Sequence, residues 1–193
     1  MKKVILLLVA VSSFAAAATA QVSYGAKGGL ALTNARGADV DGNKAKIGFY
    51  LGGYAAIPVT KQFSIQPELV YSIQGAKSEG VGEPDAKLNL NYLNVPVLAK
   101  YTSESGFFGE SGPQLGFLLS AKAKQGGEKT NLKESFKSVD LSWAFGVGYM
   151  TDFDLGFNIR YNLGLSKLDK DGDAKVFNSV FQAGVFYKLG TSK

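Results

Sequence analysis

The sequence predicts an all-β protein, an eight-stranded antiparallel up-and-down β-barrel that crosses a membrane. Three observations support this fold class: long alternating segments, connections that alternate between short and long, and an N-terminal export signal. The clearest segment is 62–74, where odd positions are apolar and even positions are polar except for Val70. A period of two places the two sets on opposite faces of a strand. The segment is long for a soluble strand and fits the roughly 9–11 residues of a tilted membrane-spanning strand.

The N-terminus predicts a secretory signal peptide. Two lysines precede an apolar run at 4–11, and Ala18-Thr-Ala20 follows as a small-residue cleavage site. The mature chain is therefore expected to begin at Gln21, with a signal peptide at 1–20 and one barrel domain at 21–193. The alternative is an uncleaved membrane helix, for which the apolar run is short.

The composition argues against several classes of function. The 193 residues include no Cys and no His, so disulfides, thiolate metal sites and the commonest general base are all absent. The 21 Lys and Arg outnumber the 16 Asp and Glu, but they are spread along the chain and form no basic block suited to nucleic acid. We therefore expect no enzyme activity, no cofactor, no metal and no nucleic-acid partner.

Eight alternating segments are predicted to be strands. They cover 23–33, 46–57, 62–74, 88–101, 107–122, 139–150, 155–166 and 176–189. Between them, connections of four or five residues alternate with longer ones, which is typical of short periplasmic turns and longer outside loops. In 88–101 the apolar residues change phase at Tyr92, which predicts a β-bulge there, because one extra residue flips the facing of a strand.

The two faces of the segments indicate which one is enclosed. A soluble ligand-carrying barrel also has about eight strands, but it places its apolar set inside. In 139–150 and 155–166 the polar sets are mostly Gly, Ala, Ser and Asn, which suit a narrow lumen. The opposite sets are large, up to Trp143, and would overfill it. This favours a membrane barrel with its large side chains against lipid.

Charged residues on the predicted inner face are expected to pair. Buried charges persist only when they are paired and hydrogen-bonded, so we expect Glu68 or Glu110 near Arg160 or Lys27. The alternative is that these charges lie on the solvated face of a soluble sheet. The predicted lumenal charges are Lys27, Lys46, Glu68, Glu110, Asp140, Arg160 and Lys188. The aromatic residues predicted for the interfacial girdles are Tyr24, Tyr71, Tyr92, Tyr101, Trp143, Tyr149, Tyr161 and Tyr187.

Five segments carry a resemblance to a known family. They are Lys27–Asn34, Phe63–Ser72, Asn91–Tyr101, Gly112–Ser120 and Arg160–Leu165. In this order they resemble the porin-family outer-membrane β-barrel domain, which includes PorT-like proteins. The resemblance spans essentially the whole chain after the signal and implies an eight-stranded barrel in the outer membrane of a Gram-negative bacterium. It carries over no catalytic residue and no cofactor.

The last predicted strand resembles the signal that barrel-assembly machinery reads in outer-membrane proteins. Gln182, Gly184, Tyr187 and Leu189 supply its polar residue, its glycine and its alternating aromatic or apolar positions. Such chains usually end on the aromatic residue, whereas this one continues to Lys193. The alternative is a chance match by an amphipathic strand.

The leading hypothesis for function is an integral outer-membrane protein with a structural or interaction role, long outside loops and a side-chain-filled polar lumen. The alternatives are a narrow channel for ions or small solutes and a soluble secreted ligand-binding barrel. The expected partners are outer-membrane lipid, lipopolysaccharide, the assembly machinery, and an unknown protein at segments 75–87 and 123–138. Lysines favour contact with the anionic lipopolysaccharide. They are Lys122, Lys124, Lys129, Lys133 and Lys137.

Overall fold

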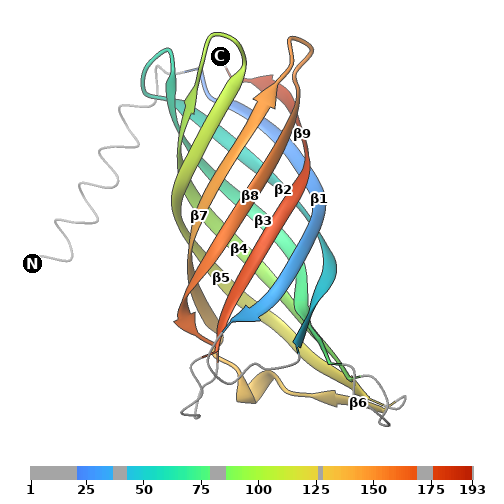
Figure 1. Cartoon of the computed structure of the whole chain (residues 1–193). Helices are drawn as coiled ribbons and strands as arrows, with labels where there is room; N and C mark the ends of the chain where they lie inside the picture. The colour runs from blue at the N-terminus through green and yellow to red at the C-terminus, as the bar shows by residue number, and fades with distance from the viewer. Residues whose placement is uncertain (1–20, 37–42, 79–85, 126–127, 169–175, 193) are drawn as a thin grey trace, which may run out of the picture.

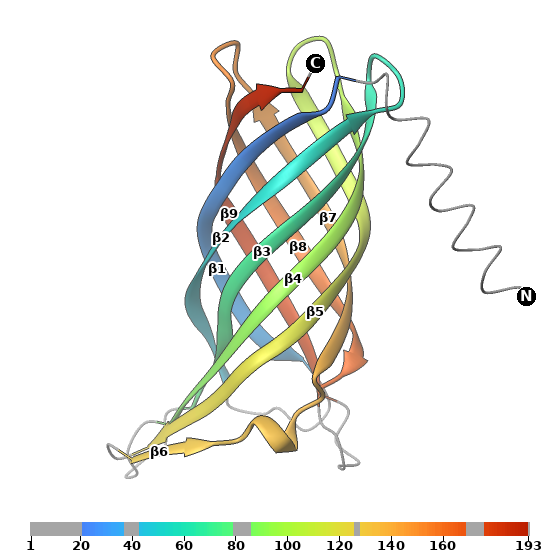
Figure 2. The same ribbon diagram turned by 180° about the vertical axis from the view of Figure 1, so that it is seen from behind.

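The strands of the computed structural model close into a barrel (Figures 1 and 2). The structure describes residues 21–36, 43–78, 86–125, 128–168 and 176–192. The predicted signal peptide therefore lies outside the described residues. The strands are β1 (Ser23–Arg36), β2 (Asn43–Pro58), β3 (Phe63–Ser78), β4 (Ala86–Thr102), β5 (Phe107–Gln125), β6 (Glu128–Asn131), β7 (Val139–Met150), β8 (Leu155–Lys167) and β9 (Phe177–Thr191).

Every strand of the barrel pairs antiparallel with its neighbours. The order is β4-β3-β2-β1-β9-β8-β7-β5, and pairing of β4 with β5 closes the ring. The short β6 pairs with the C-terminal end of β5 and is followed by a 3₁₀ turn, η2 (Lys133–Ser135). The prediction of an eight-stranded antiparallel barrel is confirmed. In the described part of the chain, no helix is long and apolar enough to cross a membrane.

The two ends of the barrel differ. Short turns join β2 to β3, β4 to β5 and β7 to β8 at one end, which we call the short-turn end (Figure 1). These turns are held locally: the Thr60 hydroxyl accepts the Phe63 N–H at 3.0 Å, and Gly106 adopts a φ of +88°. At the opposite, long-loop end, most strands run two to four residues further than predicted. The sheet pairing continues there although the alternation of apolar and polar residues that marked the strands is lost.

A register shift lies between Asn91 and Tyr92, where a bulge was expected, but its effect is different. Asn91 pairs with Ser120 and Tyr92 pairs with Leu118, so the extra residue is Leu119 of β5. The facing therefore changes in β5, where both Leu118 and Ala121 point inward.

The facing of β4 does not change at all. Leu90 and Tyr92 are buried inside the barrel together with Leu98 further along the strand. The prediction that β4 flips was wrong because the long-loop end of the lumen is apolar. Tyr92, only 1% exposed, is also excluded from the predicted aromatic girdle.

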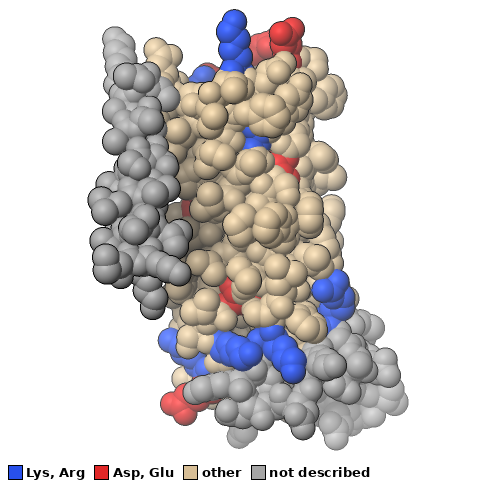
Figure 3. Space-filling view, turned by 90° about the vertical axis from the view of Figure 1, so that its left-hand side faces the viewer, with Lys and Arg blue, Asp and Glu red and all other residues tan. Residues whose placement is uncertain are grey.

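Large apolar side chains cover the outside of the barrel, and small or polar ones fill the inside. Phe63, Trp143 and Phe157 are 50%, 39% and 48% exposed, whereas Asn158 and Arg160 are 5% and 2% exposed. In Figure 3 the wall between the two ends is almost free of charged side chains. This is the arrangement of a membrane barrel.

Aromatic side chains gather on the outer wall at the short-turn end. Phe63 packs against Tyr101 and Phe107 against Tyr149, each pair with ring centroids 4.9 Å apart. Tyr24 and Tyr187 are exposed at the same end. These residues have the position of an interfacial girdle.

The outer wall predicts how the barrel responds to a new charge. Phe145 lies outward in the middle of β7, so Phe145→Arg is expected to destabilise the folded barrel in lipid vesicles by about 2–4 kcal/mol. Val59→Arg, the matched control, places the same charge in a short turn and should cost roughly 0–1 kcal/mol. Urea titration of both variants in vesicles measures the difference, and equal losses would contradict the membrane facing.

Candidate functional site

Four charged residues from four strands meet near the middle of the lumen. Arg160 of β8 binds Glu68 of β3 through both terminal nitrogens, at 2.7 and 2.9 Å. The same guanidinium donates to Oε1 of Glu110 on β5, at 2.8 Å from Nε and 2.6 Å from Nη2. Lys27 of β1 donates to both oxygens of Glu68 at 3.0 Å. Two positive and two negative charges therefore neutralise one another in what we call the central charge network.

A glycine makes this meeting possible. Glu110, Gly146 and Arg160 lie directly opposite one another on β5, β7 and β8. A Cβ at position 146 would lie 2.7 Å from Oε1 and 2.9 Å from Cγ of Glu110. Gly146 thus leaves the space through which the carboxylate and the guanidinium make contact across an intervening strand.

The network continues toward the short-turn end. Gln66 donates to Glu68 at 2.7 Å, and Lys100 donates to Gln66 at 3.4 Å. The ammonium group of Lys100 also lies 3.7 Å from the ring centroid of Phe108 and 4.7 Å from that of Phe186. Such distances are within the range of cation–π attraction, so the rings help to hold a buried cation.

Those rings belong to an aromatic layer that fills the short-turn end of the lumen. The layer consists of Tyr54, Phe108 and Phe186, with Met150 packed against it. Phe186 meets Tyr54 and Phe108 edge to face, with centroids 5.9 and 5.6 Å apart. Glycines in β7 and β8 provide room for the rings, because a Cβ at either position would collide with Phe108 or Phe186.

An apolar cap fills the long-loop end. Its buried members are Leu90, Tyr92, Leu118 and Ala121. The segment around η2 folds back over them, packing Leu132 and Phe136 against the cluster. Backbone hydrogen bonds anchor this segment, including Leu132 N–H to Ala121 C=O at 3.0 Å and Lys137 N–H to Leu168 C=O at 2.9 Å.

Between the cap and the charge network lies a polar layer. Asn178 donates to Gln74, and Gln114 donates to Ser142 at 3.1 Å. These side chains border a cavity of about 10 Å³, which is room for roughly one water molecule. Across the described residues, the lumen is thus occupied by an aromatic layer, a charge network, a polar layer and an apolar cap.

The structure places the remaining predicted charges outside the central network. Lys46 donates to the carbonyls of Gln74 and Leu88, nearer the long-loop end. Asp140 accepts a hydrogen bond from Ser166. Lys188 is about one-third exposed at the short-turn end, where it pairs with Asp154 at 3.1 Å. The prediction that Lys188 lies within the lumen was wrong, because this residue lies beyond the aromatic layer, at the rim of the barrel.

Sequence reasoning missed Lys100. This lysine is 7% exposed and shares the inward phase of β4 with Leu98. Apolar residues occupy both phases of β4, so the alternation there did not separate the inner set from the outer one. The apolar phase expected after Tyr92 nevertheless runs through Val97 and Tyr101, and it already places Lys100 on the inner face.

The residues of the predicted assembly signal lie on β9 with alternating exposure. Gln182 is buried in the lumen, while Tyr187 and Leu189 are exposed on the outer wall. A Cβ at Gly184 would meet the backbone of β1 at Gly29, so the two strands approach closely there.

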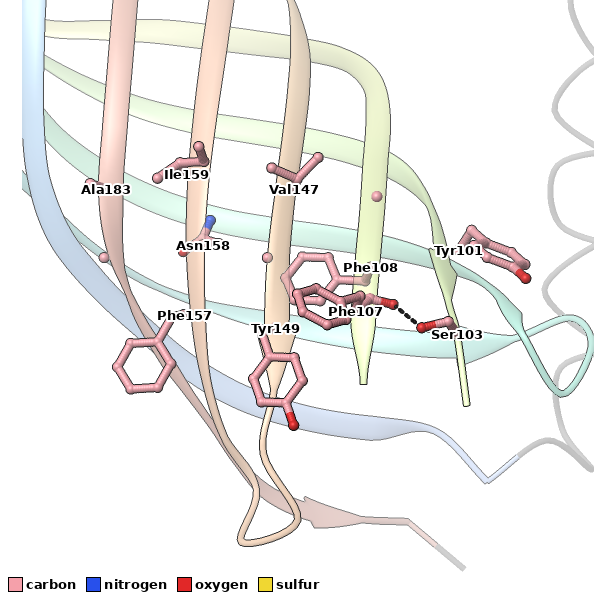
Figure 4. A pocket seen from close by; sticks show the side chains of 13 residues that line it. Tyr101, Ser103, Phe107, Phe108, Val147, Tyr149, Phe157, Asn158, Ile159 and Ala183 are labelled. Atoms are coloured by element: carbon pink, nitrogen blue, oxygen red, sulfur yellow. Dashed lines mark hydrogen bonds between the residues drawn. The ribbon is translucent and has the colours of Figure 1, made fainter. Parts of the chain in front are cut away.

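An apolar groove runs over the outer wall near the short-turn end (Figure 4). Phe107, Tyr149 and Phe157 stand along it, and Gly148 and Gly184 lie where no side chain covers the backbone. The Ser103 hydroxyl at its edge donates to the Phe107 carbonyl at 2.9 Å. Because Val147, Phe157 and Ile159 face outward, the groove belongs to the lipid-facing surface.

Comparison with known proteins agrees with this geometry. The family model described as "Outer membrane protein beta-barrel domain" matches residues 14–170. The chain belongs to this family. Outer-membrane barrels in general have short turns on the periplasmic side and longer loops on the outside. No curated protein matches the chain.

Solved structures share the fold. Neisserial surface protein A is 19% identical over 87% of this chain and 99% of its own, with a TM-score of 0.59. Ail, the attachment invasion locus protein of Yersinia pestis, was solved with the heparin analogue sucrose octasulfate. It is 18% identical over 88% of this chain and 99% of its own, with a TM-score of 0.51.

The charge network predicts that replacing a buried arginine costs much more stability than replacing a partly exposed lysine. Arg160→Met leaves two buried carboxylates without their shared partner and is expected to cost about 3–5 kcal/mol. Lys188→Met, the control, removes a partly exposed pair and should cost roughly 0–1 kcal/mol. Urea titration in vesicles measures both, and an Arg160→Met loss as small as that of the control would show that the network contributes little.

Proposed function

We propose that this outer-membrane barrel has a structural or interaction role, and that it performs neither transport nor chemistry of its own. The observation that carries the proposal is the filled lumen. An ion crossing the barrel would have to displace the aromatic layer, separate Arg160 from Glu68 and Glu110, and then lift the apolar cap.

The charge network is the strongest part of this barrier. Its members are 2–6% exposed, and Arg160 makes four hydrogen bonds to two carboxylates. Separating buried ion pairs without replacing their partners costs several kcal/mol. An eight-stranded barrel is in general just wide enough for its own side chains, so little space is left for water to replace those partners.

The outer wall argues against a soluble barrel that carries an apolar ligand. Such a barrel needs a polar exterior and an apolar cavity. Here Leu51, Phe107 and Leu189 are all more than 60% exposed, and charged and amide side chains occupy the middle of the lumen.

Two proposals concern how the protein reaches the membrane. We infer that the chain is cleaved after Ala20, because a small-residue motif follows the apolar run. We also infer that the assembly machinery reads β9, because Gln182, Gly184, Tyr187 and Leu189 match its expected pattern. The outward placement of Tyr187 and Leu189 supports the second inference.

Planar-bilayer recording tests the functional proposal. The purified full-length protein is expected to give no stable unit conductance. The variant Phe108→Ala/Phe186→Ala should also be silent, because the central charge network still closes the lumen after the aromatic layer is removed. A known pore added to the same membrane shows that the recording detects channels. Reproducible conductance steps from the unaltered protein would instead support the narrow-channel alternative.

A further inference from the structure

Four lysines form a continuous row across the sheet at the long-loop end. Lys77 of β3 lies directly opposite Lys87 of β4, which lies opposite Lys124 of β5. Lys124 in turn lies opposite Lys129 of β6. All four side chains are exposed, and we call this set the lysine row.

This arrangement is unfavourable for the protein alone. Residues directly opposite on neighbouring strands have Cβ atoms about 4.5–5.5 Å apart, and like charges at that distance repel. The row contains three such contacts in succession, and Lys122 adds a further exposed charge on β5. An anion that binds several of these ammonium groups at once would relieve the repulsion.

The lysine row faces the same way as the lipid-facing wall. On β3 the outward phase runs through Leu69 and Tyr71 to Lys77, and directly paired residues share a face of the sheet. On β5 the exposed Phe117 and Leu119 lie just before the exposed lysines. The apolar wall is therefore followed directly by a set of cations at the long-loop end, where β3, β4 and β5 lie side by side and β6 continues from β5 (Figure 2).

The long-loop end is rich in basic residues beyond the row. Figure 3 shows Lys and Arg side chains gathered at the lower margin of the wall. The other exposed or partly exposed basic residues described at this end are Arg36, Lys122, Lys133, Lys137 and Lys167. Four of them, Arg36, Lys133, Lys137 and Lys167, lie elsewhere at this end and can be substituted as a control with the same change in charge.

We propose that the lysine row is a binding site for the phosphate groups of lipopolysaccharide in the outer leaflet. Lysine binds phosphate as a compact point charge with three donors. A lipid with several phosphates can engage several lysines while its acyl chains lie along the apolar wall below them. Its confinement to the membrane also raises its effective concentration at the site. A free phosphate has no acyl chains to lie along the wall and is not confined to the membrane.

The test compares two variants with the same change in charge. The row variant carries Lys77→Gln, Lys87→Gln, Lys124→Gln and Lys129→Gln, and the control carries Arg36→Gln, Lys133→Gln, Lys137→Gln and Lys167→Gln. Surface plasmon resonance measures binding of purified lipopolysaccharide to the immobilised full-length barrel in detergent. The row variant is expected to raise Kd at least about tenfold, and the control by less than about threefold.

Further arms separate the sources of the effect. Dephosphorylated lipopolysaccharide should bind the unaltered barrel as weakly as the intact lipid binds the row variant. Arginine at the same four positions should restore binding to within about threefold, which shows that charge loss and not misfolding caused the defect. Equal losses in the row variant and the control, or an unchanged row variant, would overturn the proposal. Full displacement of the lipid by millimolar inorganic phosphate would assign the site to a free anion instead. None of these outcomes depends on whether the lumen conducts.

Discussion

The need to neutralise charge in a lumen too narrow for bulk water governs the inside of this barrel. Arg160 is 2% exposed and has two carboxylates within hydrogen-bonding distance, one of which also holds Lys27. A buried charge is tolerated only with such partners. Because Arg160 lies on β8 and the other members of the network lie on β1, β3 and β5, the network connects strands that are not neighbours in the sheet.

The layers on the two sides of the network differ in chemistry. The short-turn end holds Lys100 against the rings of Phe108 and Phe186, which stabilise the cation without a carboxylate of their own. The long-loop end places Leu90 and Tyr92 under the segment that carries Phe136. The inside therefore changes from aromatic to charged, then polar, then apolar along the barrel. It is a packed core with a charged centre.

The alternation of residues predicted the barrel, the outer wall and the four members of the central network, because a period of two assigns each residue to a face wherever the outer set is clearly apolar. The same rule failed at Tyr92, and Lys100 was not named although its phase in β4 is inward. Apolar residues fill both ends of the lumen, contrary to the expectation of a polar lumen, and β4 contributes Leu90, Tyr92 and Leu98 to the inside.

Other features depended on geometry that the sequence does not display. Lys188 has the inward phase but lies beyond the packed layers, so the position of the strand end decided its exposure. The lysine row depends on the register of three strand pairs, because the spacing of Lys77, Lys87, Lys124 and Lys129 in the sequence does not show that they lie opposite one another. Gly146 shows its purpose only once Glu110 and Arg160 are placed on either side of it.

Thiol accessibility tests most directly whether water is kept out of the interior. The chain has no cysteine, so a single Ser142→Cys substitution places one nearly isosteric probe in the polar layer, where the serine is 4% exposed. Ser105→Cys places the same probe in an exposed turn. In vesicles a small water-soluble thiol reagent should modify the turn quickly and leave position 142 unmodified until the barrel is unfolded. Modification of both positions at similar rates in the folded protein would mean that water and solutes enter the barrel and that its side chains do not seal it.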